Sequence, residues 1–173
     1  MIEANKMKLI IYRIFSFLLL PVAVLFTISV LVFIRAAFAN PAMLLPLFLV
    51  TCVAVYSFAA LNFLIKGIDG KKLLSKSSKD WLKVNAIVSI IFSLIMISQC
   101  IIFILHPEML HSLAEQAKKN AGNDLKVPEG TFENYLHITS YFFLVYAIVL
   151  FIHTLLSFQY VRLYNYLFQN EKE

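Results

Sequence analysis

Four long apolar runs alternate with short polar connectors along the chain. Each run has about 20 or more residues almost free of charge, which is enough to cross a hydrocarbon core of about 30 Å as a helix. The runs extend over residues 14–34, 41–65, 85–105 and 135–166. The pattern predicts an all-α integral membrane protein, a four-transmembrane-helix bundle that forms one membrane domain over residues 1–173.

Capping residues and helix breakers predict the ends of these helices. Asn40-Pro41 is typical of a helix start, because Asn caps free backbone amides and Pro fits the first turn. Lys66-Gly67 is typical of a helix end, and Ser77 with Asp80 resembles a capping box for the third helix. The predicted helices cover about residues 9–36, 41–66, 78–105 and 131–168. At about 1.5 Å per residue the last is on the order of 55 Å long and projects beyond the membrane.

A shorter helix is expected between the third and fourth runs. His106-Pro107 breaks the third helix, and Leu110, Leu113 and Ala114 then recur at helical spacing. We expect an amphipathic helix over about residues 107–120 in the outer loop, either lying on the membrane surface or capping the bundle.

The first run also invites comparison with a signal peptide, because Ala37-Phe38-Ala39 resembles a signal-peptidase site. The apolar region of a signal peptide is about 7–15 residues long, and this run is clearly longer. We therefore expect a retained first span.

Composition supports a membrane protein and helps to decide between lipid and nucleic acid as its partner. The chain is 61% hydrophobic and 14% charged, which lies well outside the range of soluble domains. A net charge of +5 is compatible with nucleic-acid binding, but the basic residues lie beside apolar runs instead of on a soluble domain. We expect the lipid bilayer, and no nucleic acid, as a partner.

The distribution of Lys and Arg predicts orientation. The N-terminus, the connector of residues 66–83 and the C-terminal tail together hold eleven, and the other two connectors hold four. Because cytoplasmic segments carry the excess of basic residues, both termini should be cytoplasmic. The expected location is a plasma membrane, specifically a bacterial inner membrane.

The basic connector has a second interpretation. Lys71, Lys72, Lys76 and Lys79 lie close together next to the third run. They either only set the topology or also bind anionic lipid headgroups, which attract each such residue by about 1 kcal/mol.

The fourth run carries a polar stripe, which consists of Tyr146, His153, Ser157, Tyr160 and Tyr164. These spacings place the side chains on one helical face, as expected of a surface that faces the protein interior or a partner. An interfacial aromatic belt is an alternative for Tyr160 and Tyr164, and it also suits Tyr12, Trp81 and Tyr135.

Matching depths along the four runs predict two intramembrane polar layers. His153, Ser57 and Ser93 form the first, and Gln99, Thr51 and Tyr146 form the second. Polar groups in lipid need internal partners, so both layers are interpreted as interhelical hydrogen bonding. Ligand binding or proton sensing by His153 is the alternative. In either case we expect His153 to point into the protein, towards the third span.

Other chemistry has weaker support. Cys52 and Cys100 lie in separate runs and are interpreted as buried packing residues. His106, His111 and His137 converge near the predicted outer interface, where a zinc or haem site is one hypothesis. No acidic residue falls within a run, which disfavours an active transporter, and no catalytic motif is evident. We expect no cofactor.

The function that fits best is a non-enzymatic subunit or scaffold of a membrane complex. Its fourth helix would pack against another membrane protein or a second copy. The first alternative is a small-molecule or ion pathway lined by His153 and Gln99. The second is the metal or haem site at His106, His111 and His137.

Overall fold

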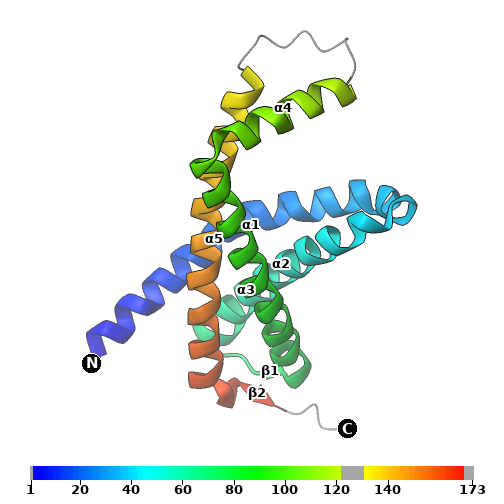
Figure 1. Ribbon diagram of the computed structural model, residues 1–173. Coiled ribbons are helices and arrows are strands. Elements are labelled where there is room, and N and C mark those ends of the chain that lie inside the picture. The colour runs from blue at the N-terminus through cyan, green and yellow to red at the C-terminus, as the bar shows by residue number, and fades with distance from the viewer. Residues whose placement is uncertain (1, 122–130, 170–173) are drawn as a thin grey trace. The chain divides into compact units, whose positions relative to one another are not determined.

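The chain is almost entirely helical. The computed structural model describes residues 2–121 and 131–169 (Figure 1). Within that part of the chain, four helical segments are long and apolar enough to span a membrane: Lys6–Ala39, Pro41–Asp69, Lys76–Leu105 and Glu133–Leu163. This confirms the predicted number of spanning segments.

Helices α1 (Ile2–Ala39) and α2 (Leu44–Asn62) form a hairpin in which they pack side by side (Figure 1). A 3-10 turn, η1 (Pro41–Met43), precedes α2, and the side chain of Asn40 accepts a hydrogen bond from the backbone N–H of Ala42 at 3.2 Å. The predicted Asn40-Pro41 start is thus confirmed. Helix α1 continues through Pro21 and begins earlier than the predicted residue 9.

Helix α2 does not stop at Lys66-Gly67, because it continues as a π-helical segment, η2 (Phe63–Asp69). The chain turns at Gly70, where an added Cβ would lie 2.9 Å from the carbonyl oxygen of Lys66. Lys71 follows with a φ of 49°, a left-handed conformation. The wider π turn therefore moves the helix end from Gly67 to Gly70.

Helix α3 (Lys76–Leu105) begins directly after the short strand β1 (Leu74–Ser75). Ser75 Oγ accepts a hydrogen bond from the backbone N–H of Ser78 at 3.2 Å and so caps the helix. Ser75 takes the capping role that the sequence assigns to Ser77, and α3 starts two residues before the predicted residue 78.

Helices α4 (Pro107–Ala121) and α5 (Thr131–Leu163) complete the helical part. In α4, Leu110 and Ala114 are buried, whereas Leu113 of the same predicted face is exposed. Helix α5 starts at the predicted residue but ends at Leu163, and its 33 residues correspond to about 50 Å. The predicted end at residue 168 is not reached, because a 3-10 turn, η3 (Asn165–Leu167), redirects the chain.

After that turn, strand β2 (Phe168–Gln169) pairs in parallel with β1. Lys79 Nζ donates a hydrogen bond to Asn165 Oδ1 at 2.5 Å and lies 5.9 Å from the centre of the Phe168 ring. The Phe63 and Phe168 rings stack with centroids 5.4 Å apart. We call β1, β2 and these side-chain contacts the clasp, because they attach the segment after α5 to the connector before α3.

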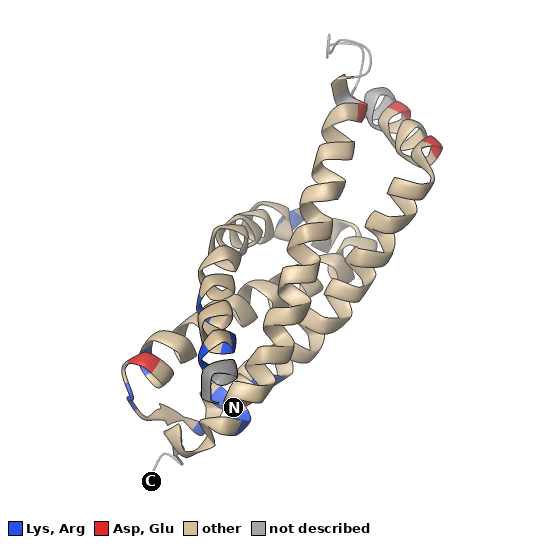
Figure 2. Cartoon of the chain, turned by 90° about the vertical axis from the view of Figure 1, so that its left-hand side faces the viewer, with Lys and Arg blue, Asp and Glu red and all other residues tan. Residues whose placement is uncertain are grey.

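The chain divides into two compact units, Met1–Phe92 with Val149–Glu173, and Ser93–Ile148. The clasp, the α1–α2 hairpin and an ion pair between Arg13 and Asp69 at 2.5 Å belong to the first unit. The described acidic residues of the second unit lie on α4 and at the start of α5 (Figure 2).

Candidate functional site

Five polar side chains from three helices meet in the interior of the first unit. Tyr12 and Ser16 come from α1, Tyr56 from α2, and His153 and Ser157 from α5. All five are buried, with at most 2% of any of them exposed. We call these five residues the His153 cluster.

Local helix geometry explains how α1 and α5 supply two residues each. Tyr12 and Ser16 are four residues apart, as are His153 and Ser157, so each pair lies on one face of its helix. Ser16 Oγ also donates a hydrogen bond to the backbone carbonyl of Tyr12 at 2.9 Å. This local bond holds the hydroxyl on the face that meets α5.

Both ring nitrogens of His153 have hydroxyl partners. Nε2 lies 2.8 Å from Ser16 Oγ, and Nδ1 lies 2.8 Å from the hydroxyl of Tyr56. Tyr56 donates its single hydroxyl hydrogen to Ser157 Oγ at 3.0 Å. Ser16 likewise donates its single hydroxyl hydrogen, to the carbonyl of Tyr12 at 2.9 Å. A neutral imidazole carries one N–H, so one ring nitrogen donates to its hydroxyl partner and the other accepts.

Aromatic rings enclose the imidazole on two sides. The Tyr12 ring stacks on His153 with centroids 4.6 Å apart and planes 1° from parallel. The Tyr56 ring meets His153 edge-on, at 5.6 Å and 69°. The Tyr12 hydroxyl closes the network at 3.0 Å from Ser157 Oγ. Tyr12 is thus an interior residue, not a member of an interfacial aromatic belt.

The order Ser16, His153 and Tyr56 resembles a nucleophile, a base and a group that orients the base. A substrate cannot reach it, because these three side chains are 2%, 0% and 0% exposed. The group on Nδ1 is moreover a phenol instead of a carboxylate, so it stabilises a developing imidazolium poorly. The arrangement is suited to joining helices, not to acyl transfer.

His153 contacts different residues from those predicted for its polar layer, which were Ser57 and Ser93. His153 is buried, as expected, but its nitrogens bond to α1 and α2 instead of pointing to the third span. Ser57 is buried and donates to the carbonyl of Val53 within its own helix, at 2.9 Å. Ser93 is also buried.

Of the second predicted layer, Thr51 belongs to the first unit, and Gln99 and Tyr146 belong to the second. Thr51 is half-buried and donates to the carbonyl of Leu47 in its own helix at 2.7 Å, and Gln99 is exposed. Tyr146 is buried, with 6% of its surface exposed. The physical reason is that a serine or threonine hydroxyl in a helix reaches the carbonyl one turn earlier more easily than a neighbouring helix.

The polar stripe of α5 faces inward. Tyr146, His153, Ser157 and Tyr160 are buried, and Tyr160 lies 5.0 Å from Tyr12 between ring centroids. Of the two alternatives left open for the stripe, the interior position applies to these residues.

The sequence interpretation missed Tyr12, Ser16 and Tyr56 as parts of this site. One signal was available, because Tyr12 and Ser16 repeat the four-residue spacing of His153 and Ser157. The matching of depths missed it because the first apolar run was taken to begin at residue 14, whereas α1 begins at Ile2.

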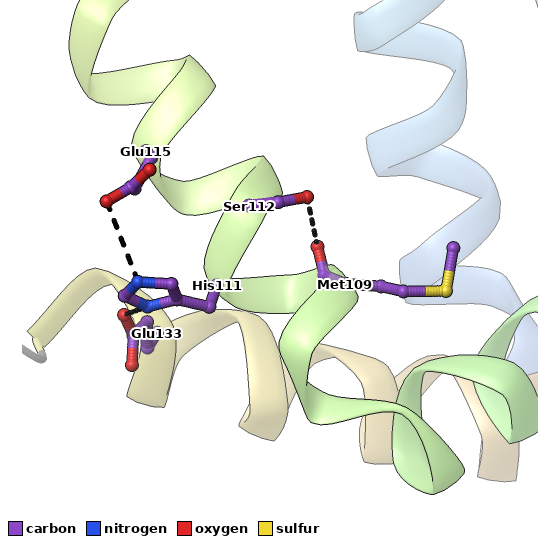
Figure 3. A network of polar contacts seen from close by, with 5 residues as sticks. All are labelled: Met109, His111, Ser112, Glu115 and Glu133. Atoms are coloured by element: carbon purple, nitrogen blue, oxygen red, sulfur yellow. Dashed lines mark hydrogen bonds and ion pairs between the residues drawn. The ribbon is translucent and has the colours of Figure 1, made fainter.

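His106, His111 and His137 belong to the second unit, and His106 and His111 have different acidic partners. His111 Nδ1 lies 2.5 Å from Glu133 and its Nε2 lies 3.6 Å from Glu115 (Figure 3). His106 pairs instead with Glu108 at 3.0 Å. Among the residues that the structure describes, no group of three or more His, Cys, Asp or Glu side chains could hold a metal ion. Within the described part of the chain, the zinc site considered for these histidines therefore lacks the ligand set it requires.

Both cysteines are buried free thiols, as predicted. Of the four lysines proposed for lipid headgroups, Lys79 is half-buried in the clasp, whereas Lys71, Lys72 and Lys76 are exposed.

No protein-family model, curated protein or solved structure matches this chain. Its function is therefore argued from its own geometry.

Proposed function

We propose that this protein is a non-enzymatic subunit or scaffold of a membrane complex. The observation that carries the proposal is the His153 cluster. Each of its polar groups is buried and is hydrogen-bonded to another part of the same chain. Its role is to hold α1, α2 and α5 together, because each interhelical hydrogen bond in a membrane protein contributes about 1 kcal/mol.

A small-molecule or ion pathway lined by His153 and Gln99 has less support than the scaffold role. Such a pathway needs the imidazole to face a water-filled space, but the ring is 0% exposed and both nitrogens are engaged. Gln99 is exposed on α3, in the other compact unit.

The partner surface proposed here is on α1, because the polar stripe of α5 is occupied by the chain itself. Ile10, Phe17, Val24, Leu31 and Phe38 recur every seven residues on α1, and each is between 44% and 77% exposed. A seven-residue apolar repeat is the period of a helix–helix seam. A membrane helix of another protein, or α1 of a second copy, would pack along this row.

The proposed orientation has both chain ends and the connector on the cytoplasmic side of a plasma membrane. Arg13, in the first third of α1, pairs with Asp69 of the connector, and Lys79 at the start of α3 bonds to Asn165 after α5. Basic residues gather around these contacts (Figure 2). This agrees with the rule that cytoplasmic segments carry the excess of Lys and Arg.

Site-specific photocrosslinking in native membranes tests the partner surface. A photoreactive residue at Val24 or Leu31 should give a discrete protein adduct, and its mass distinguishes a second copy from a different protein. Ile152 and Leu155, which are exposed on α5, provide the matched control positions. Protein adducts at the control positions with only lipid adducts on α1 would contradict the proposal.

A further inference from the structure

Two hollows flank Trp81 near the start of α3. The first, which we call the Trp81 groove, has a volume of about 420 Å³ and is lined by Lys76, Ser77, Asp80, Trp81 and Val84. The second, of about 190 Å³, is lined by Ala59, Asn62, Phe63, Leu74, Ser77, Ser78, Trp81 and Phe168. Because Ser77 and Trp81 line both hollows, the two hollows are adjacent.

We propose that the Trp81 groove binds one anionic phospholipid, with its phosphate at Lys76 and an acyl chain along Trp81 and Val84. This site does not depend on the scaffold role, and its occupant is a lipid of the surrounding bilayer.

The lining changes from polar to apolar along the helix, as an amphipathic ligand requires. Lys76, Ser77 and Asp80 occupy the first turns of α3, and Trp81 and Val84 follow further along the same spanning segment. Trp81 is 61% and Val84 60% exposed, so two large apolar side chains face outward just below a basic residue. Indole rings favour this depth, at the boundary between headgroups and acyl chains.

Charge selects an anionic lipid over a zwitterionic one. Residues 66–83 contain six lysines and two aspartates. One of these aspartates, Asp69, is paired with Arg13. Lys71, Lys72 and Lys76 are exposed, and Lys76 lines the groove. Within the groove lining, Asp80 balances Lys76, so the excess positive charge comes from the other lysines of the connector. Each lysine near the surface favours an anionic headgroup by about 1 kcal/mol.

The clasp holds the walls in place before a lipid arrives. β1 immediately precedes Lys76, and β1 is paired with β2. Phe168 of β2 stacks on Phe63 and lines the second hollow together with Trp81. A binding site whose walls are already ordered loses less conformational entropy when it is filled.

The single tryptophan of the chain makes the site directly observable. The full-length protein is reconstituted in vesicles of phosphatidylcholine with a small fraction of phosphatidylglycerol, and bromine is placed on the acyl chains of one lipid at a time. Bromine quenches indole fluorescence at short range. We expect brominated phosphatidylglycerol to quench Trp81 more than brominated phosphatidylcholine at equal mole fraction, with saturation as its fraction rises.

Lys76→Gln should weaken the apparent affinity for phosphatidylglycerol about fivefold, which corresponds to one lysine–headgroup interaction. Lys8→Gln is the matched control, because it removes the same charge from an exposed position on α1. Both substitutions are on the surface, and circular dichroism checks that the helices remain folded.

Equal quenching by the two brominated lipids would overturn the proposal. So would equal effects of Lys76→Gln and Lys8→Gln, since these would mean that the whole basic end attracts anionic lipid without a site at Trp81.

Discussion

Replacing His153 by alanine tests whether the cluster stabilises the protein. The change removes the hydrogen bonds to Ser16 and Tyr56, each 2.8 Å long, and the stacking contact with Tyr12. Interhelical hydrogen bonds in membrane proteins average about 0.6 kcal/mol and reach about 1.7 kcal/mol. Aromatic stacking adds roughly 0.5–1.5 kcal/mol.

No buried hydroxyl loses its last partner in this variant. Ser16 keeps the carbonyl of Tyr12, and Tyr56 keeps Ser157. The large penalty for an unsatisfied buried group therefore does not apply. With the cavity left by the ring, we expect His153→Ala to lower the free energy of unfolding by about 3 kcal/mol.

The assay is reversible unfolding by sodium dodecyl sulfate in mixed micelles, followed by far-ultraviolet circular dichroism. Ile152→Ala is the matched control, since Ile152 is the preceding residue of α5 and is 40% exposed. It should change the free energy of unfolding by less than about 0.5 kcal/mol.

A double-mutant cycle with Tyr56→Phe isolates the interaction. The two substitutions should be non-additive by about 1 kcal/mol, because they remove the same hydrogen bond. The reasoning is refuted if the two effects add, or if His153→Ala is no more destabilising than Ile152→Ala.

Three further predictions concern the connector, the clasp and α4. Gly70→Ala should destabilise the protein by about 1–3 kcal/mol in the same assay, because its Cβ would lie 2.9 Å from a backbone oxygen. Gly67→Ala should cost less, since its nearest neighbours are side-chain atoms of Phe63 and Leu74, and the reverse order would contradict this account of the helix end. Asn165→Ala combined with Phe168→Ala should accelerate hydrogen exchange at the amides of Leu74 and Ser75, whereas the amides around His153 stay protected. Uniform acceleration in both regions would mean that the clasp is not a separate element. The pKa of Glu108 is lowered by a hydrogen bond from its own backbone N–H and next by one from His106. Its stabilising effect on α4 is therefore present at neutral pH and is lost as the pH falls through this lowered pKa. His106→Ala should move the pKa of Glu108 back up towards its usual range in a carboxyl-carbon nuclear magnetic resonance titration, and an unchanged titration would exclude the contact with His106.

The helical content, the four spans and most helix starts follow from the order of residues alone. Long apolar runs leave the backbone no alternative to helix in a bilayer, because unpaired amides and carbonyls are too costly there. Asn40-Pro41 and His106-Pro107 act through their own backbone and side-chain chemistry, so their effect is visible without knowledge of the fold.

The end of α5 at Leu163 depended on distant residues. The chain leaves α5 early because Phe168 and Gln169 pair with Leu74 and Ser75, nearly a hundred positions earlier. A local helical pattern contains no information about such a pairing.

The partners of His153 were likewise decided by tertiary structure. Residue type and burial in a span already predicted that the imidazole would be satisfied inside the protein. Its choice of Ser16 and Tyr56 over Ser57 and Ser93 depended on where three separate helices approach one another. Hydroxyl groups are short, and only a neighbour within about 3 Å can form the bond. The sequence by itself therefore determined a helical membrane protein with a polar stripe on its fourth span, and only the packing of α1 and α2 against α5 decided that the stripe is buried and what it binds.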